Sequence, residues 1–440
     1  MQELEKFLSD FSNLVWGPWT LVLLCGTHVF LTFRLKFIQR YLMEGIKISF
    51  SRSKEGEGDI SQFGSLATAL AATIGTGNII GVATAIAAGG PGAVFWIWIT
   101  GVFGIATKYA EALLSVKYRV KMPDGTMAGG PMYVLERGMN CKWLAVLFAA
   151  FTAVTAFGIG NMVQANSVAV LMKDTFQIPQ WMTGLMIMTL TACVILGGIK
   201  SISRACEKLV PFMAIFNIVG CLILLVLKFD TIPEAFILII RSAFEGQAVV
   251  GGFLGATMKE AMRFGIARGL FSNESGMGSG AIVASAAQSK NPVRQALVSS
   301  TGTFWDTVVM CALTGLVFVN SGAWTQGLNG AGLARAAFED IPGIGPVILN
   351  VSLLTFVIAT IFGWSYYGEK ACEYLWGLKS IRPYRYLWVI AVMAGSVLSL
   401  PMVWSLADIA NAFMAVPNLI SLIVLHRVVV EETRQHLWHA

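Results

Sequence analysis

Apolar residues in this chain gather into runs long enough to cross a bilayer, and short polar connections separate the runs. A helix needs about 20 predominantly apolar residues to span the hydrocarbon core. By this rule the sequence predicts eleven membrane spans. Their approximate bounds are 15–33, 66–87, 93–116, 144–170, 180–198, 209–227, 257–287 (interrupted), 295–320, 343–367, 383–400 and 403–425. We therefore expect an all-α polytopic membrane protein with little chain left for a soluble domain.

The composition agrees with this pattern and excludes several classes of protein. Of 440 residues, 56% are hydrophobic and 13% are charged, whereas a soluble domain carries about 25% charged residues. A single-span anchored enzyme, a nucleic-acid binder and a disordered scaffold are excluded. We expect the lipid bilayer as the surroundings, no nucleic acid and no obligatory protein partner. The seven cysteines stand singly, which fits neither a disulfide framework nor a zinc site.

Lysine and arginine are distributed unevenly between the connections. Every second connection, beginning with the one after the first span, is basic: together these hold 21 Lys and Arg residues, against five in the alternate ones. Cytoplasmic connections carry this excess, so we expect the N-terminus outside and the C-terminus in the cytoplasm, in a cell (plasma or inner) membrane. The opening MQELEKFLSD has no basic region before its apolar run, so we expect the first span to be retained rather than cleaved.

The number of spans indicates an internal repeat. One leading span followed by ten leaves two halves of five, and halves with an odd number of spans enter the membrane in opposite directions, as in an inverted repeat. We expect an extra span and basic connection (1–60), a first five-helix repeat (61–230), a second, inverted repeat (231–425) and a cytoplasmic tail (426–440). Matching breaks should then occur in the first helix of each half.

The first helix of the first half carries the run TIGTGN (73–78) at its centre. Each glycine costs a helix about 1 kcal/mol relative to alanine, and Thr and Asn side chains compete for backbone hydrogen bonds. An opened helix is tolerated inside a membrane only where it lines a cavity or is buried in protein. The alternative is close helix packing through Gly77 and Gly81, a G-x-x-x-G pair.

The first helix of the second half carries the run SNESGMGSG (272–280). An exposed loop between two short spans is one alternative, but neither flank reaches about 18 clean apolar residues. Two half-helices joined by an unwound stretch explain the run better. Half-helix N-termini attract a carboxylate, and free carbonyl groups coordinate a cation such as Na⁺. Paired breaks therefore favour a carrier of a zwitterionic amino acid and an ion over a channel.

Three motifs make a family recognisable. They are the runs TIGTGNI (73–79), GLFSNESGMGS (269–279) and FGWSYYGEK (362–370), and two further runs support them, GGPMYVLERG (129–138) and FGIGNMVQANS (157–167). With these runs the chain resembles the alanine or glycine:cation symporters, also called sodium:alanine symporters. The resemblance covers about residues 60–425. It implies a LeuT-type fold of two inverted five-helix repeats, here preceded by one span. It further implies Na⁺-coupled import of alanine or glycine, without an organic cofactor.

The resemblance also implies a site. The substrate would be bound by residues from both breaks, the fourth span and the ninth span: Thr73, Gly75, Thr76, Gly77, Asn78, Asn161, Gln164, Ser272, Asn273, Gly276, Met277, Gly278 and Trp364. Trp364 would cap the side-chain end of the pocket and keep it small. A Na⁺ ion would lie between the carbonyl groups of Ala71 and Ile74 and the hydroxyl of Thr360.

The ion and the substrate stay open. This chain has Ala359-Thr360 where the family leads us to expect two adjacent hydroxyl residues, and hard cations require oxygen ligands, so coupling to H⁺ is the alternative. Glutamine, serine or D-alanine are alternative substrates. A membrane-embedded enzyme is a remote alternative, because H-E-x-x-H, G-x-S-x-G and G-x-x-x-x-G-K-[ST] are all absent from the sequence.

Charged residues inside predicted spans mark function or pairing. Lys108 and Glu111 have the spacing of an ion pair on one helix face. Glu274 either serves gating or a proton, or binds backbone N–H groups freed by the break. Asp306 and Asp408 are expected to pair inside the bundle. The charges of the outer half-helix, Lys259, Glu260, Arg263 and Arg268, indicate an extracellular gate or a wetted vestibule.

Overall fold

The computed structural model describes residues 2–51, 56–245, 258–341, 343–398 and 401–438. Almost all of these residues are helical, and the one sheet within the described ranges is a two-stranded hairpin of β1 (Val120–Lys121) and β2 (Met127–Ala128). In this hairpin Val120 pairs with Ala128 and Lys121 with Met127. The expected start of the seventh span (257), residues 399–400 of the tenth, and Arg52 and Lys54 of the first basic connection lie outside the described residues.

The first half of the chain forms long helices interrupted by short turns. The elements up to residue 117 are α1 (Gln2–Val15), α2 (Pro18–Arg34), η1 (Ile38–Tyr41), α3 (Leu42–Ser49), α4 (Gln62–Thr73), η2 (Thr76–Asn78), α5 (Ile80–Gly89) and α6 (Gly92–Lys117). Those from 131 to 244 are α7 (Pro131–Tyr133), η3 (Val134–Gly138), α8 (Lys142–Phe157), η4 (Gly158–Met162), α9 (Val163–Phe176), α10 (Gln180–Ile195), α11 (Gly198–Leu227), η5 (Phe229–Thr231) and α12 (Ile232–Phe244).

The second half has the same character. Its elements are α13 (Met258–Asn273), α14 (Ser279–Ala284), α15 (Pro292–Thr303), η6 (Phe304–Cys311), α16 (Ala312–Ser321), η7 (Ala323–Gln326), α17 (Gly330–Phe338), α18 (Gly345–Trp376), η8 (Leu378–Ser380), α19 (Ile381–Val397), α20 (Pro401–Val424), α21 (His426–Thr433) and η9 (Arg434–Trp438). The turns η3, η4, η6 and η9 are π-helical.

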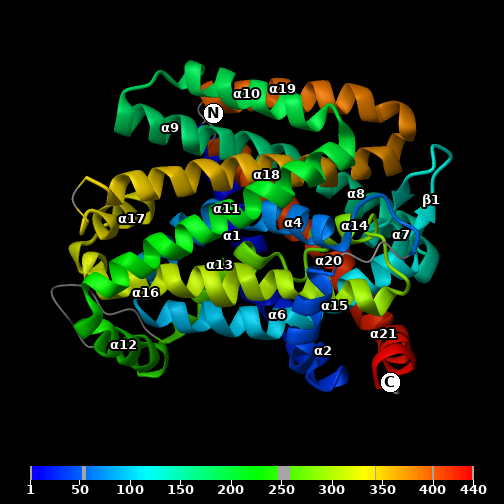
Figure 1. The fold of residues 1–440 in the computed structure, drawn as a ribbon, viewed down its shortest axis with the longest axis horizontal. Helices are drawn as coiled ribbons and strands as arrows, with labels where there is room; N and C mark the ends of the chain where they lie inside the picture. The colour runs from blue at the N-terminus through cyan, green and yellow to red at the C-terminus, as the bar shows by residue number, and fades with distance from the viewer. Residues whose placement is uncertain (1, 52–55, 246–257, 342, 399–400, 439–440) are drawn as a thin grey trace.

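The long helices run side by side across the molecule (Figure 1). Helices α12 and α17 lie at one end of the bundle, and the β-hairpin, α7 and the C-terminus lie at the other. Many large apolar side chains on the outside of these helices are exposed, including Val226 on α11 and Ile390 on α19. A soluble protein rarely exposes so much contiguous apolar surface, whereas a lipid-facing surface is expected to be apolar. The chain is therefore an all-α, multi-pass membrane protein.

Seven helices within the described residues are long and apolar enough to cross a membrane, and an eighth span results if the bent pair α4 and α5 is counted as one. These match eight of the eleven predicted spans. The other three correspond to α10, α19 and the pair α13–α14. Helices α10 and α19 have 16 and 17 residues, fewer than about 18, and α13 carries Lys259, Glu260, Arg263 and Arg268.

Helix ends differ from the predicted bounds where polar residues continue a span. Helix α18 extends to Trp376 rather than ending near 367, because its last turns bury charged side chains in pairs. Lys370 donates to Glu373 at 2.7 Å, and Glu369 accepts two hydrogen bonds from Arg385. A span predicted from hydropathy alone ends at such charged residues, although charges that are paired can be buried.

Candidate functional site

The first break separates α4 from α5 by a bend of 63°. Asn78 stabilises it, because its Oδ1 accepts a hydrogen bond from the Gly75 backbone N–H at 2.9 Å. A Cβ atom at Gly75 would lie 2.8 Å from the Thr360 hydroxyl oxygen of α18, so only glycine allows this close approach. A Cβ at Gly81 would meet nothing within 4 Å. The alternative of close packing through a Gly77/Gly81 pair is therefore wrong at Gly81.

The second break lies between α13 and α14. Glu274, Gly276 and Gly278 all have positive φ, at 53°, 92° and 80°, which is the conformation that opens a helix and favours glycine. The backbone N–H groups of Gly276 and Gly278 donate to one oxygen of Glu111, at 2.8 and 3.0 Å. Both helices that the sequence predicts to be broken are thus broken at the predicted runs.

Glu111 of α6 is the anchor of the second break. The same Oε1 also accepts a hydrogen bond from the Asn418 amide at 2.7 Å, and Asn418 in turn donates to the Gly276 carbonyl. Lys108 lies 3.9 Å from the other Glu111 oxygen and donates to the Glu274 backbone carbonyl at 3.3 Å. The predicted Lys108–Glu111 pair is therefore present, and it holds the unwound stretch in place.

Asp306 of η6 joins the two breaks. One of its carboxylate oxygens accepts from Asn78 of the first break at 2.7 Å, and the other accepts from Ser272 of the second break at 2.9 Å and from Thr307 at 2.7 Å. Asp306, Asn78 and Ser272 are almost completely buried. The expected pairing of Asp306 thus takes place with neutral donors rather than with a cation.

Between the breaks lies a small buried cavity of about 20 Å³, roughly the volume of one water molecule. Seven predicted site residues line it: Thr73, Gly75, Thr76, Gly77, Gln164, Thr360 and Trp364. Five further lining residues were not predicted to bind substrate: Ala72, Ile159, Phe271, Glu274 and Asn411. An amino acid is larger than this volume, so the cavity must widen to admit one.

The cavity has polar groups of both signs. The backbone N–H groups of Thr76 and Gly77 stand at the start of a helical segment and have no hydrogen-bond partner in the part of the chain that the structure describes. The Oε1 of Gln164 is buried and also lacks a partner among the described residues, while its Nε2 donates to the Ile159 carbonyl. Glu274 places its carboxylate here, accepting from the Trp364 indole N–H at 3.2 Å and from Ser279 at 2.5 Å.

Glu274 carried a signal in the sequence that the site prediction did not use. A carboxylate in an unwound membrane segment is a functional candidate by default. Of its two predicted roles, binding of freed backbone N–H groups falls instead to Glu111. Phe271 carried no such signal, because a single aromatic residue on a membrane helix normally packs.

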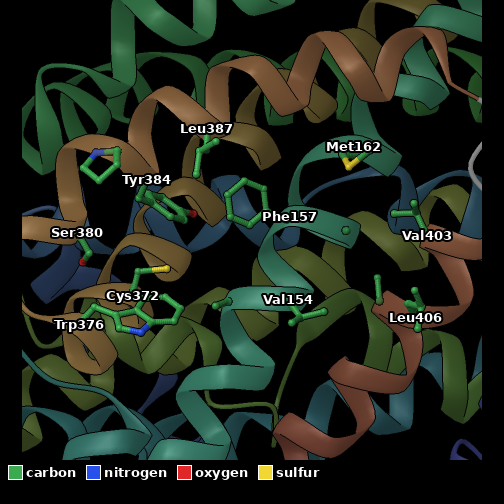
Figure 2. A pocket seen from close by; sticks show the side chains of 14 residues that line it. Val154, Phe157, Met162, Cys372, Trp376, Ser380, Tyr384, Leu387, Val403 and Leu406 are labelled. Atoms are coloured by element: carbon green, nitrogen blue, oxygen red, sulfur yellow. The ribbon is translucent and has the colours of Figure 1, made fainter.

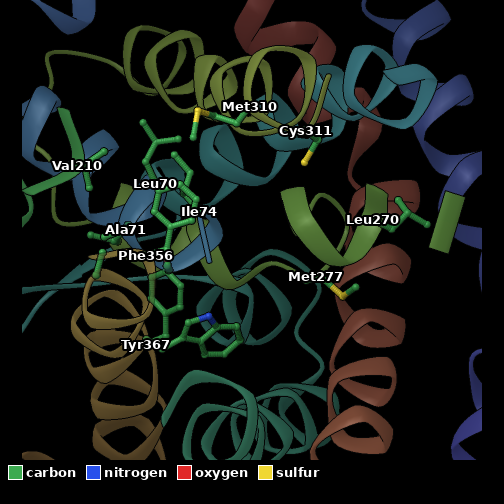
Figure 3. Close-up of a cluster of buried hydrophobic side chains, with 14 of the residues drawn as sticks. Leu70, Ala71, Ile74, Val210, Leu270, Met277, Met310, Cys311, Phe356 and Tyr367 are labelled. Carbon is green, nitrogen blue, oxygen red and sulfur yellow. The ribbon is translucent and has the colours of Figure 1, made fainter. Parts of the chain in front are cut away.

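Seven predicted substrate residues do not line the cavity. Asn78 and Ser272 bind Asp306; Asn161 donates to the Trp388 carbonyl; Asn273 accepts from the Ser275 N–H; Gly276 and Gly278 are held by Glu111. Met277 is 1% exposed and belongs to the buried apolar cluster that also contains Ala71 and Ile74 (Figure 3). These residues are near the breaks but do not line the cavity.

The residues predicted to bind Na⁺ come together in part. The Thr360 hydroxyl lies 3.4 Å from the Ile74 carbonyl oxygen and donates to the Phe356 carbonyl at 2.9 Å. Thr355 and Ser365, the nearest other hydroxyls on α18, bond to carbonyls of their own helix. Among the described residues, no group of three or more His, Cys, Asp and Glu side chains forms a metal site. Neutral carbonyl and hydroxyl oxygens fit a hard monovalent cation.

A second hollow of about 160 Å³ lies on the other side of Phe271. Arg263 and Arg268 of α13, Asp408 of α20, and Ser12, Asn13 and Trp16 from the N-terminal helical segment line it. Phe271 lines both hollows, so its ring lies between them. Of the four outer half-helix charges that the sequence assigned to a gate or vestibule, Arg263 and Arg268 line this hollow, whereas Lys259 and Glu260 do not.

Comparison with known proteins places the chain in a family. The family model for the sodium:alanine symporter family matches residues 1–439. A sodium/alanine symporter of Methanococcus maripaludis, AgcS, is 50% identical over 440 residues, covering 98% of this chain and 96% of the relative. A probable sodium/glutamine symporter of Bacillus subtilis, GlnT, is 35% identical, covering 97% and 90%. An uncharacterized transporter of Haemophilus influenzae is 49% identical, covering 98% and 96%. The chain belongs to the sodium:alanine symporter family.

Proposed function

We propose that the protein is a secondary active symporter that imports small neutral amino acids, alanine or glycine, together with Na⁺ by alternating access. One observation carries this proposal: two broken helices meet at a buried cavity that presents free backbone N–H groups and an acidic side chain. A zwitterion needs both. The family membership and the relative AgcS, whose name states sodium/alanine symport, support the same function.

The carboxylate of the substrate binds at the first break. The N–H groups of Thr76 and Gly77 lie at the N-terminal end of η2 and α5, where the helix carries partial positive charge. The ammonium group of the substrate binds the carboxylate of Glu274 and the free Oε1 of Gln164. The other predicted residues of the two breaks hold this arrangement through their hydrogen bonds to Asp306 and Glu111.

The size of the cavity favours a small side chain. Trp364 is 2% exposed and its indole N–H is fixed by Glu274, so the ring closes the cavity on one side. Alanine and glycine require the smallest widening. Serine, D-alanine and glutamine remain alternative substrates of the same fold, and glutamine is named for the relative GlnT.

Na⁺ binds at the Ile74 carbonyl and the Thr360 hydroxyl, with the Ala71 carbonyl as a further ligand. This places the cation beside the first break, so its binding stiffens the segment that receives the substrate carboxylate. By linkage, the substrate raises the affinity for Na⁺ by the same factor. The alternative coupling ion is H⁺, for which Glu274 and Asp306 are two of the buried carboxyl groups at the breaks.

The membrane arrangement belongs to the same proposal. Eleven spans form a LeuT-type fold, with one leading span, repeats over 61–230 and 231–425, and a tail over 426–440. The N-terminus lies outside and the C-terminus in the cytoplasm. The breaks in α4–α5 and α13–α14 support the inverted repeat, since each lies in the first helix of its half. The clustering of the β-hairpin, α7 and the C-terminus at one end of the bundle supports a common cytoplasmic side (Figure 1).

The driving force is sufficient for accumulation. One positive charge moving through about 100 mV supplies ~2.3 kcal/mol, and each tenfold accumulation requires ~1.4 kcal/mol. The potential alone therefore supports about 40-fold accumulation, to which an inward Na⁺ gradient adds.

Uptake of labelled alanine into proteoliposomes tests the function. We expect uptake with an inward Na⁺ gradient, stimulation by an inside-negative potential, and none with K⁺ alone. Uptake driven by a pH step without Na⁺ would identify H⁺ as the coupling ion. No uptake of alanine, glycine, serine, D-alanine or glutamine under any gradient would overturn the proposal. Competition by these unlabelled amino acids ranks the substrates.

A further inference from the structure

A large cavity lies apart from the substrate cavity. It has a volume of about 550 Å³ and is walled almost entirely by apolar side chains of α8, α18, α19 and α20 (Figure 2). In Figure 2, Val154 and Phe157 lie in the middle of the lining, between Trp376 on the left and Leu406 on the right, with Leu387 above. We call this cavity the α8–α19 groove.

The groove opens toward the apolar outside of the bundle. Its lining includes four large side chains that are substantially exposed: Val154 at 52%, Trp376 at 68%, Leu387 at 57% and Leu406 at 46%. They lie on helices that cross or flank the membrane region, so the medium that meets them is lipid. A hydrocarbon chain fits such a groove, because it makes close van der Waals contacts with the apolar walls.

Two cationic residues adjoin one end of the groove along the chain. Ser380 and Pro383 line that end, and Lys379 and Arg382 stand next to them in the chain. Both cations are exposed, and neither has a hydrogen bond or an ion pair with any residue in the described ranges. Arg385, one turn further on, is by contrast engaged by Glu369. Unpaired cations beside an apolar groove complement an anionic headgroup joined to an acyl chain.

We propose that the α8–α19 groove binds one acyl chain of an anionic phospholipid, whose phosphate headgroup is held by Lys379 and Arg382. The hydrocarbon chain runs from Ser380 past Leu387 toward Val403, along the lining residues. The lipid comes from the surrounding bilayer. A zwitterionic phospholipid offers the same chain but no net negative charge, so it binds more weakly.

The groove and the substrate cavity share one turn of helix. Gly158 and Met162 of the π-helical turn η4 line the groove, whereas Ile159 of the same turn lines the substrate cavity. Gly160, between them, packs so closely on Trp364 that a Cβ there would lie 2.4 Å from that side chain. A lipid chain in the groove would therefore contact the turn η4 on the side away from the substrate cavity. Such π-helical turns often occur at functional sites. This consequence rests on the proposed function, whereas the lipid site itself does not.

Photolabelling tests the lipid site directly. The protein is reconstituted in phosphatidylcholine vesicles with a trace of phosphatidylglycerol that carries a diazirine in its acyl chain, and labelled peptides are mapped after illumination. We expect labels on 153–162 and 383–387. Val154→Trp and Leu406→Trp fill the groove and should remove these labels, whereas Ile215→Trp, on the exposed face of α11, should not.

The headgroup is tested by charge removal. Lys379→Gln and Arg382→Gln should each lower groove labelling by phosphatidylglycerol about five-fold, the effect of roughly one surface cation on an anionic lipid. Lys208→Gln, an exposed cation of α11, should leave it unchanged. Equal labelling of the groove by a phosphatidylcholine probe, or persistence of the labels in both tryptophan variants, would show annular lipid only and overturn the proposal. Because labelling needs no transport, this result is independent of the uptake assay.

Discussion

Asn78 and Asp306 connect the two halves of the chain at the centre of the molecule, with 2.7 Å between the Asn78 amide nitrogen and an Asp306 carboxylate oxygen. The other end of the Asn78 amide accepts from the Gly75 N–H, and the other Asp306 oxygen accepts from Ser272. One amide therefore fixes the first break and ties it, through one carboxylate, to the second. The two breaks are coupled by side chains rather than by helix packing alone.

Asn78→Ala should weaken both the fold and the site. It leaves the Gly75 N–H and one Asp306 oxygen without partners, and a lost hydrogen bond to a buried charged group costs about 1.5–3 kcal/mol. We expect a lower unfolding temperature in detergent, with folded protein still present, and loss of alanine binding. Thr84→Ala, on α5 beyond the break, is the matched control and should keep both properties. If Asn78→Ala bound alanine as tightly as the parent protein, Asn78 would have no role in substrate binding.

Glu274→Gln separates the charge of this residue from its hydrogen bonds. Glutamine is nearly the same size and can still accept from Trp364 and bond to Ser279, so the unfolding temperature should change little. We expect the ammonium group of the substrate to lose the charged partner proposed for it, and a charge-assisted bond is worth about 1.5–3 kcal/mol, or about ten- to 100-fold in affinity.

Equilibrium binding of labelled alanine measures this effect, and Glu339→Gln, an exposed carboxylate on the outside of the bundle, controls for charge removal in general. If Glu274→Gln binds alanine as tightly as the parent protein does, the ammonium group is held elsewhere. A matching loss in Glu339→Gln would point to a general effect of charge.

The sequence predicted both helix breaks but only part of the lining of the cavity. Glycine, threonine and asparagine in the middle of an apolar run leave a local signal, so the runs at 73–78 and 272–280 were found and both are open in the structure. The residues that bond to these runs have no such local signal in the sequence. Asp306 is 228 residues from Asn78, and Glu111 and Asn418 are 165 and 142 residues from Gly276. Only the packed bundle shows which of these side chains bonds to which group of the breaks.

The same limit explains why some predicted pocket residues do not line the cavity. Ser272 and Asn273 were predicted from their types and their place in the unwound run, yet Ser272 turns to Asp306 and Asn273 caps the Ser275 N–H. Glu274, between them, has a positive φ of 53°, and its carboxylate lines the cavity instead. Which way a side chain points from an unwound backbone depends on φ and ψ, which the residue types do not specify.

We expect Trp364 to limit the size of the substrate. Its ring lines the cavity and packs at 5.4 Å between ring centroids against Tyr367. Trp364→Leu should widen the pocket and shift the competition panel toward larger amino acids such as glutamine. An added methylene group in an apolar pocket is worth about 1–3 kcal/mol, so the change in preference should be about ten- to 200-fold.

The measurement is inhibition of labelled alanine uptake by unlabelled amino acids of increasing size. Trp388→Leu, a buried tryptophan of α19 that does not line the cavity, is the control for loss of a large core side chain. An identical ranking in Trp364→Leu and in the parent protein would contradict a role for Trp364 in selecting size.

We expect the choice of coupling ion to depend on Thr360. Its hydroxyl oxygen lies 3.4 Å from the Ile74 carbonyl and would meet a Cβ added at Gly75, so it stands directly beside the first break. Thr360→Val removes this oxygen and keeps the shape of the side chain, whereas Thr360→Ser keeps the oxygen and removes a methyl group. Loss of one ligand oxygen from a hard-cation site should raise the Na⁺ concentration for half-maximal uptake by about tenfold in Thr360→Val, equivalent to ~1.4 kcal/mol. Thr360→Ser should stay close to the parent value.

If both variants keep the parent Na⁺ dependence, the cation does not use Thr360. If instead uptake follows a pH step in every variant without Na⁺, the buried carboxyl groups of Glu274 and Asp306 become the coupling groups, because Glu274 lines the cavity and Asp306 bonds to both breaks.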